Sequence, residues 1–170
     1  DNPSPEEVDD LIVTARKVEE NLQEVPLSIS VLDQYEIEDN NIRTISDISA
    51  YIPNLLQFSV GGAGMYTPCV RGLSADIHTL NSPVAMYVDG VPYISSVGNN
   101  IVLEDVERIE VLRGPQGTLY GKNAYAGVIN IMTKAPGNEI KGGVKATFGE
   151  DSKREYALNL SGPIIKDKLY

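Results

Sequence analysis

The sequence is poor in the side chains from which active sites and metal sites are most often built. Its 170 residues include one histidine, His78, and one cysteine, Cys69. A His-rich metal site, a repeated histidine dyad and an internal disulfide are therefore excluded. Cys69 and His78 could form a nucleophilic thiol–imidazole pair, but nothing in the sequence supplies a group to orient it. The simpler interpretation is a core thiol and a loop histidine, so we expect no catalytic residues, no metal site and no cofactor.

Long apolar runs are also absent. No stretch approaches the roughly twenty apolar residues that a membrane-spanning helix needs. The N-terminus also lacks the basic region followed by an apolar region that is typical of a secretory signal peptide. We therefore expect no helix of this chain to span a membrane.

The net charge of −10 comes entirely from the N-terminal part of the chain. Residues 1–41 hold twelve acidic and two basic residues, whereas residues 42–170 hold twelve of each. The first ten residues, DNPSPEEVDD, contain five acids and two prolines, a composition that predicts a flexible arm. The neutral remainder has no basic stripe that could bind phosphates, so a nucleic-acid partner is not expected.

Hydrophobic patterns in the middle of the chain predict short strands and short helices. Strands are expected at residues 27–32, 55–60, 69–73, 84–88, 91–94, 108–112 and 126–132. Helices are expected from residue 33 and over residues 44–52, with single helical turns at 103–106 and 118–120. Thr44 and Asp47 are spaced as a capping box, and Asp89-Gly90 is typical of a type I′ hairpin turn. Together these elements predict an α+β fold, a small mixed β-sheet with short helices.

The pattern changes after residue 136. Residues 144–148 and 155–161 alternate apolar and polar positions, which is typical of lipid-facing strands in a membrane β-barrel. A closed barrel needs about eight strands or more, so we interpret these two as the start of a truncated β-barrel from a longer protein. Their edges would be unpaired, and we predict that they pair with the preceding sheet or between chains.

The most informative segment is residues 105–136, DVERIEVLRGPQGTLYGKNAYAGVINIMTKAP. Residues 108–112 alternate charged and branched side chains, which predicts a half-buried strand, and residues 128–132 repeat the pattern. The turn between them contains four glycines and a proline, residues suited to tight turns and close backbone approach. Gly117, Gly121 and Lys122 superficially suggest a phosphate-binding loop. That interpretation fails because three residues, not four, separate the glycines and Asn123 replaces the required Ser or Thr.

This segment closely resembles the signature near the end of the plug domain of TonB-dependent outer-membrane receptors. Four earlier segments occur in the order that plug domains show, namely ENLQEVPLSISV (20–31), ISDISAYIPN (45–54), VRGL (70–73) and VAMYVDGVPY (84–93). The resemblance covers residues 10–136. Residues 142–149 and 155–163 are similar to the first strands of the barrel that surrounds the plug.

The resemblance implies three parts, namely a flexible acidic arm with a TonB box (1–16), a plug domain (17–136) and the first barrel strands (137–170). It implies the gate of an active transporter in the outer membrane of a Gram-negative cell, which imports a scarce ligand such as a ferric siderophore. The implied partners are the C-terminal domain of TonB and a barrel of about 22 strands. The alternative is a freestanding periplasmic binding or assembly domain with a similar small sheet. Neither is an enzyme.

The resemblance also suggests functional residues. The TonB box, which would pair with TonB by strand addition, corresponds to Asp10, Leu11, Ile12, Val13, Thr14 and Ala15; alternatively, these residues form an ordinary edge strand. Ionic contacts between plug and barrel would involve Arg71, Arg113 and Glu110. Glu110 could instead pair inside the plug with Arg108 or Arg71, and the arginines could form ordinary surface ion pairs. Ligand-facing loops would present Met65, Tyr66, His78, Tyr93, Ser95, Ser96, Asn99 and Asn100.

Overall fold

A computed structural model of the chain describes residues 12–14, 17–18, 20–59, 61, 65–75, 81–93, 100–135, 137–149 and 154–165. The chain divides into two compact units, Asp1–Thr133 and Lys134–Tyr170, which are considered separately. In the described part of the chain, no helix has the length and apolar character needed to cross a bilayer.

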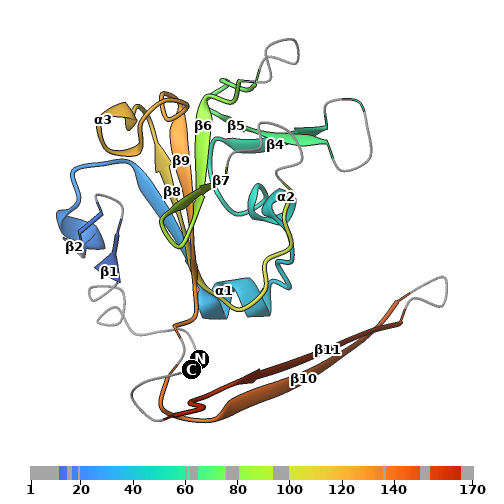
Figure 1. The fold of residues 1–170 in the computed structure, drawn as a ribbon. Coiled ribbons are helices and arrows are strands. Elements are labelled where there is room, and N and C mark those ends of the chain that lie inside the picture. Colours follow the sequence, from blue (N-terminus) through green and yellow to red (C-terminus); the bar gives the residue numbers. More distant parts are fainter. Residues whose placement is uncertain are drawn as a thin grey trace. The chain divides into compact units, whose positions relative to one another are not determined.

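A mixed five-stranded sheet forms the centre of the first unit (Figure 1). Its strands, in spatial order, are β3 (Ile29–Asp33), β8 (Val106–Arg113), β9 (Gly127–Thr133), β6 (Val84–Val88) and β7 (Val91–Tyr93). Strands β6 and β9 are parallel, and the other neighbours are antiparallel. The predicted α+β fold with a small mixed sheet is confirmed.

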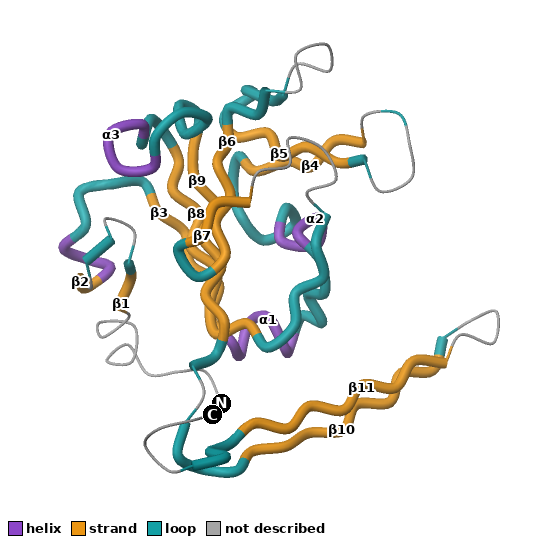
Figure 2. The backbone as a smooth tube through the Cα atoms, viewed as in Figure 1, coloured by secondary structure: helices purple, strands orange, loops and turns teal. Residues whose placement is uncertain are grey.

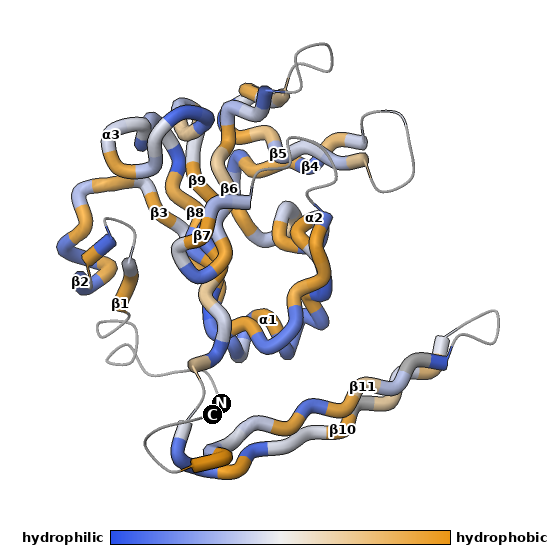
Figure 3. Tube along the Cα trace, in the orientation of Figure 1, coloured by the Kyte–Doolittle hydropathy of each residue, from blue (hydrophilic) through white to orange (hydrophobic). Residues whose placement is uncertain are grey.

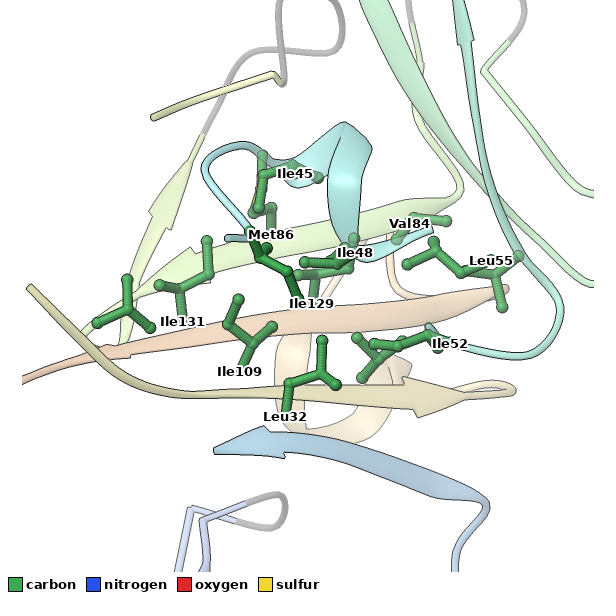
Figure 4. Close-up of a cluster of buried hydrophobic side chains, with 14 of the residues drawn as sticks. Leu32, Ile45, Ile48, Ile52, Leu55, Val84, Met86, Ile109, Ile129 and Ile131 are labelled. Atoms are coloured by element: carbon green, nitrogen blue, oxygen red, sulfur yellow. The ribbon is translucent and has the colours of Figure 1, made fainter. Parts of the chain in front are cut away.

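Two short helices, α1 (Gln34–Asp39) and α2 (Ile45–Ile48), cover one face of this sheet (Figure 2). Ile45 and Ile48 are buried in one cluster with Ile109 and Ile129 of the central strands, as Figure 4 shows. Both helices begin as predicted. Asp33 and Glu36 form a capping box at α1, and Thr44 and Asp47 form one at α2.

The predicted helix over residues 44–52 is too long. Helix α2 ends at Ile48, and residues 49–54 continue as turns, with the Ile52 amide still donating to the Ile48 carbonyl at 3.1 Å. The apolar stripe of this segment is nevertheless buried as expected, because Ile52 joins the same core cluster.

The opposite face of the sheet is covered by the N-terminal part of the chain and by one helical turn (Figure 1). The covering elements are β1 (Ile12–Val13), β2 (Glu20–Asn21), the 3₁₀ turn η1 (Leu22–Glu24) and α3 (Gly117–Tyr120). Val13, Val25 and Tyr120 pack there in one cluster with Leu112 and Val128 of the sheet. This second core explains why the central strands are buried on both faces, whereas the sequence predicted a half-buried strand at 108–112.

The segments that connect the strands test three local predictions, one hairpin turn and two helical turns. Asp89 and Gly90 have φ angles of 49° and 76°, which confirms the type I′ hairpin between β6 and β7. The helical turn predicted at 103–106 is wrong, because the Leu103 amide bonds the Arg43 carbonyl at 2.7 Å and Val106 already belongs to β8. The turn predicted at 118–120 is confirmed as α3.

A hairpin of β4 (Leu55–Ser59) and β5 (Tyr66–Val70) packs beside the sheet as a separate two-stranded ribbon. The strand predicted at 69–73 is displaced, since β5 ends at Val70. Arg71 and Gly72 have φ angles of 54° and 82°, so the backbone turns there instead of continuing extended. The strand predicted at 55–60 corresponds to β4.

The second unit is one long hairpin of β10 (Lys141–Phe148) and β11 (Arg154–Ser161). In their register Val144 lies opposite Leu158 and Ala146 opposite Tyr156, so these apolar residues share one face. Figure 3 shows the resulting alternation along both strands. The two strands pair with each other as a two-stranded sheet, and pairing of their outer edges with the preceding sheet or between chains stays a prediction.

Candidate functional site

Residues 12–14, called the docked segment below, lie against the sheet instead of extending as an arm. Val13 is fully buried in the second core cluster, and Ile12 beside it is exposed. The Thr14 amide donates to Glu110 Oε1 at 2.8 Å, and the Thr14 hydroxyl lies 3.2 Å and 3.4 Å from the two oxygens of the same carboxylate. The flexible arm expected for residues 1–16 therefore does not include these three residues. Asp10, Leu11 and Ala15 lie outside the described residues.

Lys17 closes the turn that follows the docked segment. Its amide donates to the Thr14 carbonyl at 2.8 Å, and its backbone has a φ of 61°. The Lys17 ammonium lies 5.3 Å from the ring centroid of Tyr120 and 5.9 Å from that of Tyr87, which is cation–π distance. Both main-chain polar groups of Thr14 are thus bonded within the domain.

The two tyrosines beneath Lys17 form a fixed pair. The Tyr87 hydroxyl donates to the Tyr120 carbonyl at 2.8 Å, and the rings pack edge to face at 5.0 Å. Burial, the negative charge of Glu110 and the neighbouring Tyr87 raise the pKa of Tyr120 to about 12. Tyr120 is therefore a neutral, buried side chain at ordinary pH.

Glu110 occupies the middle of the sheet beneath the docked segment. The register places Val31, Glu110, Asn130 and Tyr87 in one row across β3, β8, β9 and β6. The Glu110 side chain is 0% exposed; its Oε1 accepts from Arg108 Nε at 3.0 Å and its Oε2 from Asn130 Nδ2 at 3.4 Å. The structure thus has the Arg108 pairing that the sequence left open, and in this arrangement the Glu110 carboxylate is inaccessible to a barrel.

Sequence reasoning overlooked Asn130 as a partner in this site. The signal was present, because Asn130 interrupts the apolar run Val128-Ile129-Asn130-Ile131, and a buried amide needs a hydrogen-bonding partner. It could not be interpreted without the register that sets Asn130 opposite Glu110.

Arg71 and Arg113, the arginines of the two Arg-Gly pairs, converge on one turn. The Arg71 amide donates to the Asn54 carbonyl at 3.1 Å, and Arg113 Nη1 donates to the Pro53 carbonyl at 3.3 Å. Arg71 Nη1 lies 3.2 Å from the point that a Cβ on Gly114 would occupy. Arg113 Nε is buried without a hydrogen-bond partner. Within the described part of the chain neither guanidinium has a carboxylate partner.

The predicted ligand-facing residues are only partly described. Met65 and Tyr93 are 39% and 37% exposed, at the β4–β5 hairpin and at the end of β7, and Tyr66 is half-buried at the start of β5. Asn100 has a structural role, because its Oδ1 accepts from the Ser46 amide at 2.8 Å in the first turn of α2. His78, Ser95, Ser96 and Asn99 lie outside the described residues.

The described residues offer little for catalysis. Cys69 is 2% exposed, and burial raises the pKa of its thiol, with a hydrogen bond from the Gly72 backbone opposing the shift. The buried thiol expected from the sequence is confirmed, and its raised pKa disfavours the nucleophilic thiolate. In the ranges that the structure describes, no three His, Cys, Asp or Glu side chains are grouped to hold a metal ion.

Comparisons with known proteins agree with this architecture. The family model "TonB-dependent Receptor Plug Domain" matches residues 21–128. The chain is 36% identical over 162 residues to the pesticin receptor of Yersinia pestis, covering 94% of this chain and 24% of that protein. It is 34% identical over 152 residues to the vitamin B12 transporter BtuB of Vibrio vulnificus (strain CMCP6), covering 86% of this chain and 24% of that protein.

Solved structures support the same relationship. The ferric yersiniabactin uptake receptor FyuA from Yersinia pestis superposes with a TM-score of 0.75 at 35% identity, over 82% of this chain and 22% of that chain. The ferripyoverdine receptor of Pseudomonas aeruginosa has the same fold, with a TM-score of 0.76 at 23% identity, over 90% of this chain and 20% of that one. The chain spans about a quarter of the length of the curated relatives it matches. It belongs to the TonB-dependent receptor plug family, as the plug domain of an outer-membrane receptor.

Proposed function

We propose that this plug is the gate of a TonB-dependent importer whose ligand is a ferric siderophore. The observation that carries the proposal is the plug-family match over residues 21–128. The choice of ligand rests on the similarity to FyuA, described as a ferric yersiniabactin uptake receptor, at 35% identity. Vitamin B12 transporters are also similar, at 34% identity, so a cobalamin is the ligand against which a siderophore must be tested.

We assign coupling to TonB to residues 10–15. The described part of this stretch supports the assignment, because it already forms a two-residue strand, which pairs with β2 and packs Val13 against the sheet. Strand addition by a partner would use the main-chain hydrogen bonds of such a segment and the exposed side chain of Ile12.

We assign the second unit to the wall of a barrel of about 22 strands. The apolar face of β10 and β11 supports this, since Val144, Leu158 and Leu160 are about four-fifths exposed in the chain alone. A lipid-facing surface would cover that face. The two arginines Arg71 and Arg113 fit a role as cations that bind carboxylates on the inner wall, because neither has such a partner in the described residues.

The coupling assignment can be tested by calorimetric titration with the periplasmic C-terminal domain of TonB. The chain would be compared with a deletion of residues 1–9, which keeps the segment, and a deletion of residues 1–16, which removes it. We expect the first deletion to bind like the intact chain and the second to lose binding. Equal binding by both deletions would move the coupling site elsewhere. Because Val13 is buried, urea unfolding of each deletion serves as the control for an intact fold.

The ligand assignment needs the receptor in its membrane. Outer membranes that contain the receptor would be tested for retention of ferric siderophores and of vitamin B12. Saturable retention of a ferric siderophore with none of vitamin B12 is the expected result. The reverse result would replace the siderophore with a cobalamin and leave the importer proposal standing.

A further inference from the structure

The contact between Thr14 and Glu110 links the candidate coupling segment to the interior of the sheet. The two residues are 96 positions apart in the sequence, and the Glu110 side chain is fully buried. Thr14 supplies both an amide and a hydroxyl to the carboxylate, so a single residue provides much of its hydrogen bonding. The remaining partners are Arg108 and Asn130 on the same face of the sheet.

Hydrogen bonds to an ionised carboxylate are among the stronger ones in proteins. They are also costly to break when the acceptor is buried, because the charge loses partners that water does not immediately replace. The docked segment therefore leaves Glu110 only at a free-energy cost, which holds the segment against the domain.

Strand addition and docking exclude one another at this segment. The Thr14 amide is bonded to Glu110, and the Thr14 carbonyl accepts from the Lys17 amide. The Val13 side chain is fully buried beside Leu112 and Val128. The main chain of Ile12 and Val13 is paired with Asn21 and Glu20 of β2, so a partner that pairs with these residues as a strand must displace β2 or the carboxylate that accepts from the Thr14 amide.

We propose that Glu110 controls access to the docked segment by holding it in a closed position through Thr14. The proposal rests on the assignment of residues 10–15 as the site for TonB. In the closed position the partner cannot pair with the segment, so the apparent affinity is lowered by the small fraction of molecules that are open. Weakening the Thr14–Glu110 contact raises that fraction without changing the partner's own contacts.

Two substitutions test the Thr14–Glu110 contact separately from the stability of the sheet. Thr14→Val removes the hydroxyl and leaves the Arg108–Glu110 ion pair intact. Glu110→Gln removes the charge and leaves the docked segment unchanged in sequence. The matched control is Thr133→Val, because the Thr133 hydroxyl also donates to a carboxylate, that of Asp89, at 2.8 Å, and neither residue bonds Thr14 or Glu110.

The first measurement is amide hydrogen exchange of residues 13 and 14 in the 170-residue chain and its variants. We expect both substitutions to raise exchange at these amides about tenfold, the size expected for losing one hydrogen bond to a charged group. Amides of Ile109, Val111 and Ile129 should keep their wild-type protection in Thr14→Val. The double variant should exchange little faster than the single variants, since both act on one contact. Unchanged exchange at residues 13 and 14 in both variants would overturn the proposal.

The second measurement is titration of wild type and Glu110→Gln with the C-terminal domain of TonB. Tighter binding by Glu110→Gln, by the factor seen in exchange, supports control of access. Binding of equal strength, where exchange has risen, would overturn it. If wild type and variant both fail to bind TonB, the coupling assignment fails, and the exchange result alone decides whether Glu110 holds the segment.

Discussion

Substitution of Gly127 by alanine tests how closely β8 and β9 approach one another beside Arg113. The register places Gly127 opposite Arg113, and a Cβ at Gly127 would lie 2.5 Å from the Leu112 carbonyl oxygen and 3.3 Å from a methyl carbon of Val70. The φ of Gly127 is outside the left-handed region, so the substitution causes no backbone strain of its own. Any effect therefore reports the contact alone.

The size of the effect follows from the distances. Ordinary contact begins at 3.4 Å, so the Leu112 carbonyl and the new methyl group must separate by 0.9 Å, the difference between 3.4 Å and 2.5 Å. The neighbour is main chain in a central strand and cannot rotate away, which places the cost toward the upper part of the range for overpacking, about 2–3 kcal/mol. In urea unfolding this corresponds to a fall in the midpoint of about 1 M with an unchanged slope.

Gly117→Ala is the matched control. Gly117 begins α3, and a Cβ there would have no heavy atom within 4 Å. Alanine in a helix is favoured over glycine by about 0.5–1 kcal/mol, so this variant should be as stable as wild type or slightly more stable. If Gly127→Ala unfolds at the same urea concentration as wild type and Gly117→Ala, the close-approach argument is wrong.

Two further predictions concern pH. Burial would raise the pKa of the Asp47 carboxyl, but hydrogen bonds from the Arg43 and Thr44 amides and the Thr44 hydroxyl, together with the Arg43 charge, outweigh it and lower the pKa. Asp47 therefore contributes stability above about pH 4, and this stability is lost as the pH falls through its native pKa. The substitution Asp47→Ala should lower the urea midpoint by the equivalent of about 1 kcal/mol at neutral pH and by less in acid. Tyr120 has a native pKa of about 12 against about 10 unfolded, so its contribution is complete below pH 10 and declines as the pH rises toward 12. The urea midpoint of wild type should therefore fall relative to that of Tyr120→Phe between pH 9 and pH 12, and a constant difference would contradict this assignment.

Features that depend on a few neighbouring residues could be predicted from the sequence. The Asp89-Gly90 hairpin follows from the positive φ angles that a type I′ turn requires, and the capping box of Thr44 and Asp47 follows from spacing alone. The alternation in β10 and β11 likewise fixes which residues share a face.

Features that depend on distant partners could not be predicted in the same way. Alternation in residues 108–112 suggested a strand with one wet face, and the burial of Glu110 arises only because the N-terminal segment folds back over that face. The sequence allowed Arg108 or Arg71 as the partner of Glu110, and only the three-dimensional arrangement selects Arg108. The early end of α2 is also a tertiary effect, because Ile52 reaches the core through a turn.

Because β3 lies at the edge of the sheet, tension should unfold the parts of this domain in a fixed order. The chain leads from the docked segment through β2 into β3, and β3 is bonded only to β8, through five register pairs. Strands β8, β9 and β6 each have two neighbours. Tension applied at the N-terminus would therefore peel residues 12–33 from one edge while the three interior strands stay paired, and the domain could yield in part and close again without refolding from the beginning.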